Sequence, residues 1–332
     1  MTGVTKFVLA IVILTVFLPS SFAQHALDSP SDGRSMMVNV LDAQGNAVRN
    51  LSKENFHLRV NGKPVVVLDA RYSLAPRRIV VLLDMSGSMG SEDAPAGKWR
   101  IAQEAAENLL TETPDDVPIA MLTFSSKVLN VFDFSQRRAA IANWLKESAS
   151  PQRKRKYPVQ TALFDAVFEA LKLLQPFQPG DAVYAITDGG DNASQASATK
   201  TKLALLQSGV RLFGFLFVEP SRPPYSGSQK EQDGTVSFLS IVNDTGGYMF
   251  GVPGRWRVPS WPPGYVYDDD DNPAKIKVFT QRLNIQVSGF WTLELGDIPS
   301  NARRMKLDVV SKEGKIGKDI WVTYSRALLA VR

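Results

Sequence analysis

Five side chains with hard oxygen donors stand where predicted strands run out into loops. They are Asp84, Ser86, Ser88, Thr161 and Asp188. Oxygen donors of this kind suit a small hard cation such as Mg²⁺. Two carboxylates and three hydroxyls carry less negative charge than an all-carboxylate cage. We therefore expect a loosely held cation with one coordination position left open, which a carboxylate from outside the protein could fill. That chemistry is binding and not catalysis.

An alternation of apolar strands and helices must position these side chains. Continuous aliphatic runs such as 79–83 and 119–124 are typical of strands buried on both faces. Helical periodicity follows each strand, and this order predicts parallel pairing through right-handed crossovers. We expect an α/β fold with three layers and a doubly wound, mostly parallel sheet. Ligand sites of such sheets lie beyond the carboxyl ends of the strands, where Asp84 and Asp188 are placed.

Two β-rich segments flank this α/β region. The first, 36–72, contains the turn sequence Asn61-Gly62, a strong hairpin signal. The second covers 290–324. Each alone has few strands and little core, so we expect the two to pack together as one small β-sandwich. The predicted organisation is a signal peptide at 1–23, an N-terminal β module at 24–75, the α/β domain at 76–252, a loop rich in Pro, Trp and Asp at 253–273, and a C-terminal helix and β segment at 274–332.

The amino terminus has the layout of a secretory signal peptide. A segment with one positive charge, Lys6, precedes an apolar run over 7–18, and small residues end at Ala23, where we expect cleavage. The run is shorter than a membrane-spanning helix requires, and an uncleaved anchor is the alternative. The chain has no cysteine and therefore no disulfide. These features favour a secreted, periplasmic or cell-envelope protein of bacterial type.

Three motifs together resemble those of the von Willebrand factor A domain. They are Asp84-x-Ser86-x-Ser88 after a strand, Thr161 at the opening of a helix, and Thr187-Asp188-Gly189 after a later strand. The resemblance covers about 78–250, and the flanking modules make the whole chain look like the related proteins of acidobacteria. It implies a metal-ion-dependent adhesion site in which the hydroxyls of Ser86, Ser88 and Thr161 bind the metal directly or through water. The resemblance implies that the two aspartates act mainly through water or as direct ligands.

Some of these residues also have simpler structural interpretations. Thr161 could simply cap its helix without binding a metal. We expect Asp191, next to the third loop, to be solvated. The basic run Arg153, Lys154, Arg155 and Lys156 precedes Thr161 and either attracts an acidic partner or is an exposed loop. The acidic run 268–271 lacks the glycine and glutamate of an EF-hand loop, which favours a solvated loop.

The sequence leaves three classes of function open. The first is an exported, non-enzymatic module that uses Mg²⁺ (with Mn²⁺ or Ca²⁺ as alternatives) to bind a Glu or Asp of a partner protein. The second is an assembly scaffold of an envelope complex with metal-independent docking. The third, a hydrolase, is disfavoured because the only histidines, His25 and His57, are not placed to activate Ser86. One short basic run without interleaved aromatic residues argues against nucleic acid as a partner. Oligomeric state is not indicated.

Overall fold

The computed structural model describes residues 35–74, 77–90, 98–148, 160–217, 229–252, 273–298, 304–310 and 320–326. The predicted signal peptide, the basic run 153–156 and the Pro-rich segment 253–272 lie outside these residues. Within them, none of the helices has the length and apolar character needed to cross a membrane.

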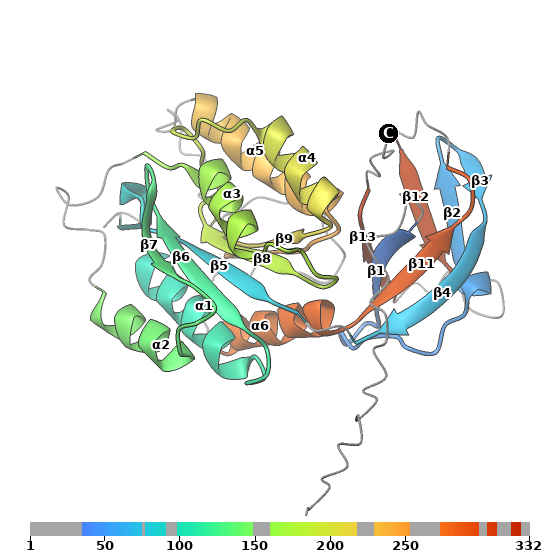
Figure 1. The fold of residues 1–332 in the computed structure, drawn as a ribbon, viewed down its shortest axis with the longest axis horizontal. Coiled ribbons are helices and arrows are strands. Elements are labelled where there is room, and N and C mark those ends of the chain that lie inside the picture. The colour runs from blue at the N-terminus through green and yellow to red at the C-terminus, as the bar shows by residue number, and fades with distance from the viewer. Residues whose placement is uncertain are drawn as a thin grey trace, which may run out of the picture. The chain divides into compact units, whose positions relative to one another are not determined.

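A six-stranded sheet forms the centre of the α/β domain (Figure 1). Its strand order is β10-β9-β8-β5-β6-β7. The strands are β5 (Ile79–Asp84), β6 (Ile119–Phe124), β7 (Val128–Phe132), β8 (Ala182–Thr187), β9 (Arg211–Phe217) and β10 (Met249–Val252). All neighbours pair in parallel except β7, which is antiparallel to β6. The predicted mostly parallel, doubly wound sheet is therefore confirmed.

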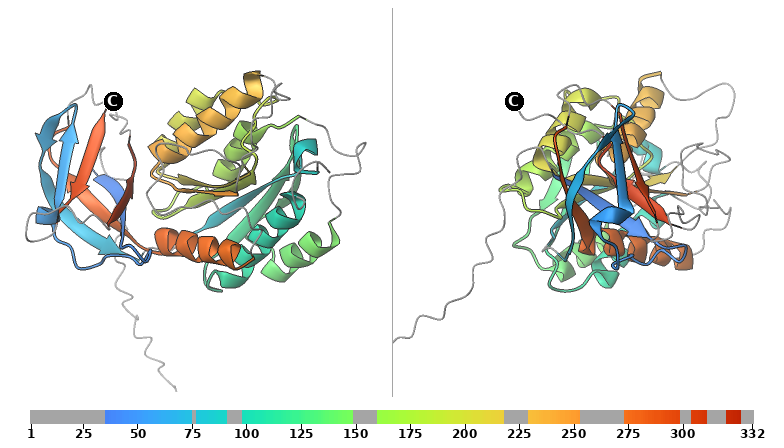
Figure 2. Two further views of the ribbon diagram at one scale, coloured as in Figure 1. Left: turned by 180° about the vertical axis from the view of Figure 1, so that it is seen from behind. Right: turned by 90° about the vertical axis from the view of Figure 1, so that its right-hand side faces the viewer.

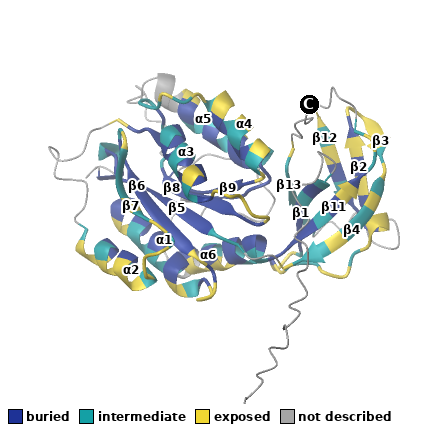
Figure 3. Cartoon of the chain, viewed as in Figure 1, coloured by how far each residue is buried: buried dark blue, intermediate teal, exposed yellow. Residues whose placement is uncertain are grey.

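Helices cover both faces of this sheet, as Figures 1 and 2 show. They are α1 (Lys98–Glu112), α2 (Arg138–Glu147), α3 (Leu163–Leu173), α4 (Ala198–Ser208), α5 (Gln229–Asp244) and α6 (Pro273–Ser288). Successive side chains of β5 point to opposite faces. Val81 and Leu83 join the core beneath α1, α2 and α6, whereas Val80 and Leu82 join the core beneath α3, α4 and α5. This division explains why the strand is apolar at every position, and Figure 3 shows the buried strands between the helices.

Strands from both ends of the chain build the flanking β module. They are β1 (Ser35–Leu41), β2 (Phe56–Val60), β3 (Lys63–Val65), β4 (Val67–Ser73), β11 (Phe290–Leu295), β12 (Met305–Val309) and β13 (Trp321–Tyr324). One sheet has the order β13-β1-β11-β4 and the other β12-β2-β3. Side chains of both sheets, including Val38, Leu58 and Leu293, share one core. The predicted Asn61-Gly62 hairpin joins β2 to β3, and both turn residues have positive φ.

One buried arginine fastens the β module to the α/β domain. Arg211, at the start of β9, is 2 % exposed. Its guanidinium donates to the Asn39 side chain of β1 and to the Gln286 carbonyl of α6, at 3.0 Å for the latter. The rings of Phe213 and Phe290 lie against the same group, with centroids 5.3 and 5.4 Å away. Burial lowers the pKa of Arg211 to about 10, so it stays charged at neutral pH.

The serine that precedes α2 does not cap this helix. α2 begins at Arg138, and Arg137 is at the cap position. The Ser135 hydroxyl instead donates to the Asp133 carboxylate at 2.5 Å, and so does its backbone amide at 2.9 Å. The serine is therefore part of a turn closed by the preceding aspartate.

Candidate metal centre

The first loop of the site follows β5 directly. Asp84, the last residue of the strand, is completely buried. Its Oδ1 atom accepts the Ser86 amide at 2.8 Å, which turns the chain back over the carboxylate. A short 3-10 helix then runs over Gly87–Gly90. The hydroxyls of Ser86 and Ser88 lie 3.0 Å apart, so the alternation of serines in the motif brings their two oxygens to one place.

The third loop, after β8, is tied to the first by a threonine. The Thr187 hydroxyl donates to Oδ2 of Asp84 at 2.6 Å and accepts the Gly189 amide at 3.0 Å. Gly189 has a φ of +80°, and a Cβ there would lie 2.7 Å from the Leu216 side chain. Glycine is therefore required for this turn, which places Asp188 at the same end of the sheet as Asp84. Its side chain is 14 % exposed.

The second loop places Thr161 beside the third loop. The Thr161 amide donates to Oδ1 of Asn192 at 2.8 Å, and the Asn192 amide donates to the Thr161 carbonyl at 3.0 Å. Thr161 is 3 % exposed. The alternative that it caps α3 is wrong, because Ala162 is the cap residue and the Phe164 amide donates to Asp191 instead.

Asp191 therefore has a structural role that we did not expect. It is 5 % exposed and not solvated. Its Oδ2 atom accepts both the Phe164 amide, at 2.9 Å, and the Ser194 hydroxyl, at 2.6 Å. A carboxylate at the first turn of a helix satisfies a free backbone amide and complements the helix dipole. Asp191 therefore connects the third loop to α3, and these hydrogen bonds occupy its carboxylate.

Burial makes the charge of Asp84 costly. Desolvation, and secondly the nearby charge of Asp188, raise the pKa of Asp84 to about 7, against the opposing hydrogen bonds from Thr187 and Ser86. Among the described residues no cationic side chain contacts this carboxylate. A cation beside both carboxylates would reverse the effect. The site thus carries negative charge that a bound divalent cation would neutralise.

A lysine that the sequence analysis missed lies beside the other carboxylate. Lys98, the first residue of α1, has a side chain only 6 % exposed, and its Nζ lies 3.3 Å from Oδ2 of Asp188. The sequence does contain one signal for this contact. A lysine in the first turn of a helix is unfavourable next to the helix dipole, so its presence there indicates a nearby anionic side chain.

The donor set fits a small hard cation. Within the described residues no three or more His, Cys, Asp or Glu side chains cluster as metal ligands. A cation at these loops would therefore depend on hydroxyl oxygens as well as on Asp84 and Asp188. The chain offers these at Ser86 and Ser88, and at Thr161 on the adjoining loop. Soft or nitrogen-seeking metals would find no matching ligands in these three loops.

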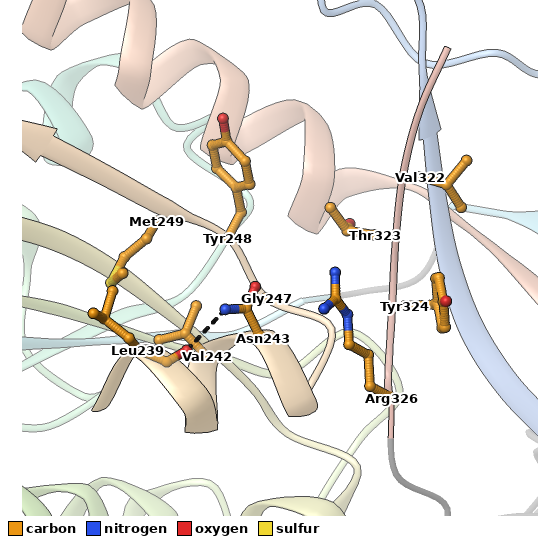
Figure 4. A pocket seen from close by; sticks show the side chains of 10 residues that line it. All are labelled: Leu239, Val242, Asn243, Gly247, Tyr248, Met249, Val322, Thr323, Tyr324 and Arg326. Carbon is orange, nitrogen blue, oxygen red and sulfur yellow. Dashed lines mark hydrogen bonds between the residues drawn. The ribbon is translucent and has the colours of Figure 1, made fainter. Parts of the chain in front are cut away.

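A small cavity lies at the opposite end of the sheet from this site. It has a volume of about 60 Å³. Figure 4 shows its lining, which α5, the start of β10 and β13 supply. Asn243, at its wall, donates to the Leu239 carbonyl at 3.1 Å. The cavity is remote from the three loops, because it meets β10 at its amino end. His57 is on β2 of the β module and belongs to neither place.

Comparisons with known proteins agree with the α/β assignment. Residues 79–190 match the family model of the von Willebrand factor type A domain. No protein with curated annotation matches the chain significantly.

Three solved structures are similar at low identity. The first is a conserved hypothetical protein BatB from Bacteroides thetaiotaomicron, with 18 % identity, 63 % of this chain and 98 % of that chain covered, and a TM-score of 0.43. The second is an aerotolerance-related membrane protein from Bacteroides fragilis carrying multiple mutations to serine, with 16 % identity, the same coverages and a TM-score of 0.43. The third is a von Willebrand factor type A protein from Catenulispora acidiphila, with 13 % identity, 90 % and 75 % covered, and a TM-score of 0.43.

The matched residues 79–190 contain all three loops of the candidate site, from the motif that begins at Asp84 to the turn at Gly189. The strands that carry these loops lie in a mostly parallel sheet that helices cover on both faces. The chain therefore contains a von Willebrand factor type A domain, a kind of domain that generally serves as a non-enzymatic protein-interaction module.

Proposed function

We propose that the protein is an exported, non-enzymatic module that binds a partner protein through a divalent cation, Mg²⁺ in the first place, at the three loops. The hydroxyls of Ser86, Ser88 and Thr161 would hold the ion, with the two aspartates as direct ligands or through water. The observation that carries the proposal is the buried Asp84, whose charge lacks a cationic partner among the described residues, next to a second carboxylate and a pair of hydroxyls.

The bound ion would supply an electrophilic coordination position for a partner's carboxylate. The chain's own residues do the rest. Ser86 and Thr187 orient the Asp84 carboxylate through their hydrogen bonds. Asn192 fixes the backbone of Thr161. With only two carboxylates in the site, the charge of a divalent ion would be balanced but not exceeded, so a partner's carboxylate could still bind at an open coordination position. Mn²⁺ and Ca²⁺ accept the same oxygen ligands and remain alternatives to Mg²⁺.

Export and the envelope or secreted location are part of the proposal. They rest on the amino-terminal sequence, with its short apolar run and small residues before position 24, and on the absence of cysteine. The basic run 153–156, which lies outside the described residues, is proposed as a second contact for an acidic partner because it precedes Thr161 in the sequence.

The proposal is tested by selecting random displayed peptides on the purified protein in Mg²⁺ and eluting them with EDTA. We expect the eluted peptides to contain an acidic residue, and replacing that Glu by Gln should abolish binding. Asp84→Ala protein should retain none of these peptides. Asp115→Ala serves as the matched control, because the Asp115 side chain is fully exposed in the turn that follows α1.

Two results would contradict the proposal in different ways. Binding that persists in EDTA and in the Asp84→Ala protein would indicate the metal-independent docking scaffold. Binding that depends on Mg²⁺ but is unchanged by the Glu-to-Gln replacement would retain the metal site and remove the partner's carboxylate from the account.

A further inference from the structure

Lys98 places a positive charge inside the candidate metal centre. Its side chain is 6 % exposed, although burying an ammonium group is costly unless it is paired. It also stands in the first turn of α1, where the helix dipole disfavours a cation. Neither solvation nor the helix explains this position. The Asp188 carboxylate, 3.3 Å from the ammonium nitrogen, does.

The contact between Lys98 and Asp188 differs from a permanent structural ion pair in this same chain. Arg78 binds Asp181 through two nitrogens, at 2.6 and 3.0 Å, and that carboxylate is fully buried. The contact between the Lys98 ammonium and Asp188 is longer, at 3.3 Å, and Asp188 remains 14 % exposed. A longer, partly exposed charge contact is weaker and more easily exchanged than a short, bidentate and buried one. Its geometry suits a partner that can be replaced.

The same carboxylate cannot satisfy the lysine and a metal ion equally. A divalent cation bound at Asp188 would bring its charge close to the ammonium group, and like charges at this separation repel strongly in a partly buried site. We propose that Lys98 is an internal cation that competes with the divalent metal ion for Asp188 and thereby lowers the metal affinity of the site. This inference rests on the proposed function, because it requires that the three loops bind a metal.

The competition has a reciprocal consequence. If the ammonium group weakens metal binding, metal binding must equally weaken the contact between Lys98 and Asp188. The lysine then leaves the carboxylate when the ion arrives and becomes more accessible. Metal affinity and lysine accessibility are two separate measurements of one coupling.

Calorimetric titration with MgCl₂ of the purified full-length protein and its variants tests the proposal. Lys98→Met removes the charge while keeping an unbranched side chain that tolerates burial. We expect it to bind Mg²⁺ at least about tenfold more tightly than the wild type, the effect of about 1.4 kcal/mol of lost repulsion. Lys98→Arg, which keeps the charge, should bind within a few-fold of the wild type. Lys172→Met is the matched control, because Lys172 is an exposed lysine on α3.

The outcomes separate this proposal from the one on which it rests. Tighter binding by Lys98→Met, including the case in which only this variant binds measurably, supports the competition. Equal or weaker binding by Lys98→Met would overturn the competition and leave the metal site standing. Absence of binding in both proteins would overturn both proposals.

A measurement on the wild type covers the case in which Lys98→Met does not fold. Lysines are acylated with an N-hydroxysuccinimide ester, and the modification of each is followed by mass spectrometry. Saturating Mg²⁺ should raise the labelling rate of Lys98 several-fold and leave that of Lys172 unchanged. An unchanged rate at Lys98 would overturn the proposal.

Discussion

Two completely buried aspartates stand at opposite ends of neighbouring parallel strands. Asp181 precedes β8 at the amino end of the sheet, and Asp84 closes β5 at the carboxyl end. Arg78 neutralises Asp181 through two contacts and also donates to the carbonyls of Leu174 and Pro176. Among the described residues, Asp84 accepts hydrogen bonds from Ser86 and Thr187 without a cationic partner, and a second carboxylate, Asp188, lies nearby.

The difference separates a carboxylate that the chain itself neutralises from one that we propose binds a metal ion. At the amino end, Arg78 neutralises the charge of the buried carboxylate and donates hydrogen bonds to it, so no ligand from outside the chain is needed. At the carboxyl end the chain provides oriented oxygens and leaves the charge unbalanced. The cation that we propose would stabilise this site. Without it, the packing of the rest of the sheet offsets the cost of the buried charge.

The largest expected effect is at the amino end. Arg78→Met would leave Asp181 buried with no cation, and breaking one half of a buried pair costs about 3–5 kcal/mol. We expect this loss in the free energy of unfolding, measured by urea denaturation, with or without Mg²⁺. A loss below about 1 kcal/mol would mean that this pair contributes no more than an exposed surface pair. Asp181 would then not be a carboxylate that depends on Arg78 for its charge balance.

The second prediction concerns pH at the carboxyl end. The pKa of Asp84 rises from 3.8 to about 7 on folding, so between these values the folded protein binds the proton more tightly than the unfolded chain. The free energy of unfolding of the metal-free protein should therefore fall as pH rises through this window, by at most about 1.4 kcal/mol per pH unit. Asp84→Asn should remove this part of the slope.

Urea denaturation of both proteins in EDTA at several pH values measures the difference. Above the window, Asp84→Asn should be at least as stable as the metal-free wild type, because it removes a buried charge that lies near Asp188. Equal slopes in the two proteins would mean that Asp84 does not carry the unbalanced charge.

The third prediction concerns the connection between the domains. Arg211→Met would remove the donor shared by Asn39 and Gln286 and leave buried acceptors without it. Losing hydrogen bonds of this kind costs about 1–3 kcal/mol. We expect a lower thermal midpoint and, because the contact joins two cores, earlier proteolysis near the β module. Unchanged stability would show that the packing of Phe213 and Phe290 alone holds the contact.

The smallest effect is expected at the surface. Asp115→Ala removes a fully exposed carboxylate that lies 3.7 Å from Arg138. Exposed pairs contribute little, so the free energy of unfolding should change by less than about 0.5 kcal/mol. A larger change in thermal denaturation would disqualify this variant as a control for the metal experiments.

The sequence predicts most of the fold because the relevant signals are local. The apolar run of β5 indicates a strand buried on both faces, and the motif that follows it places Asp84, Ser86 and Ser88 together. The contacts that it does not predict join distant positions. Lys98 and Asp188 are 90 residues apart, and Arg211 and Asn39 are 172 apart.

The capping of α3 is a second contact that the sequence does not predict, although the residues involved are closer together along the chain. Thr161 stands at the position where a cap is expected, yet Asp191, 27 residues after Phe164, accepts the free amide of the helix. Only the pairing of the second and third loops brings this carboxylate to the helix. Composition and periodicity carry no information about such a choice between two competing oxygen donors.

Thermal unfolding with and without Mg²⁺ tests the central claim most directly. A ligand that binds only the folded state adds about 2.7 kcal/mol at a hundredfold excess over its dissociation constant. The account predicts that Mg²⁺ raises the thermal midpoint of the wild type and of Asp115→Ala, and that Asp84→Ala shows no rise. A midpoint that Mg²⁺ leaves unchanged in the wild type, or raises equally in Asp84→Ala, would contradict a metal site at the carboxyl end of the sheet.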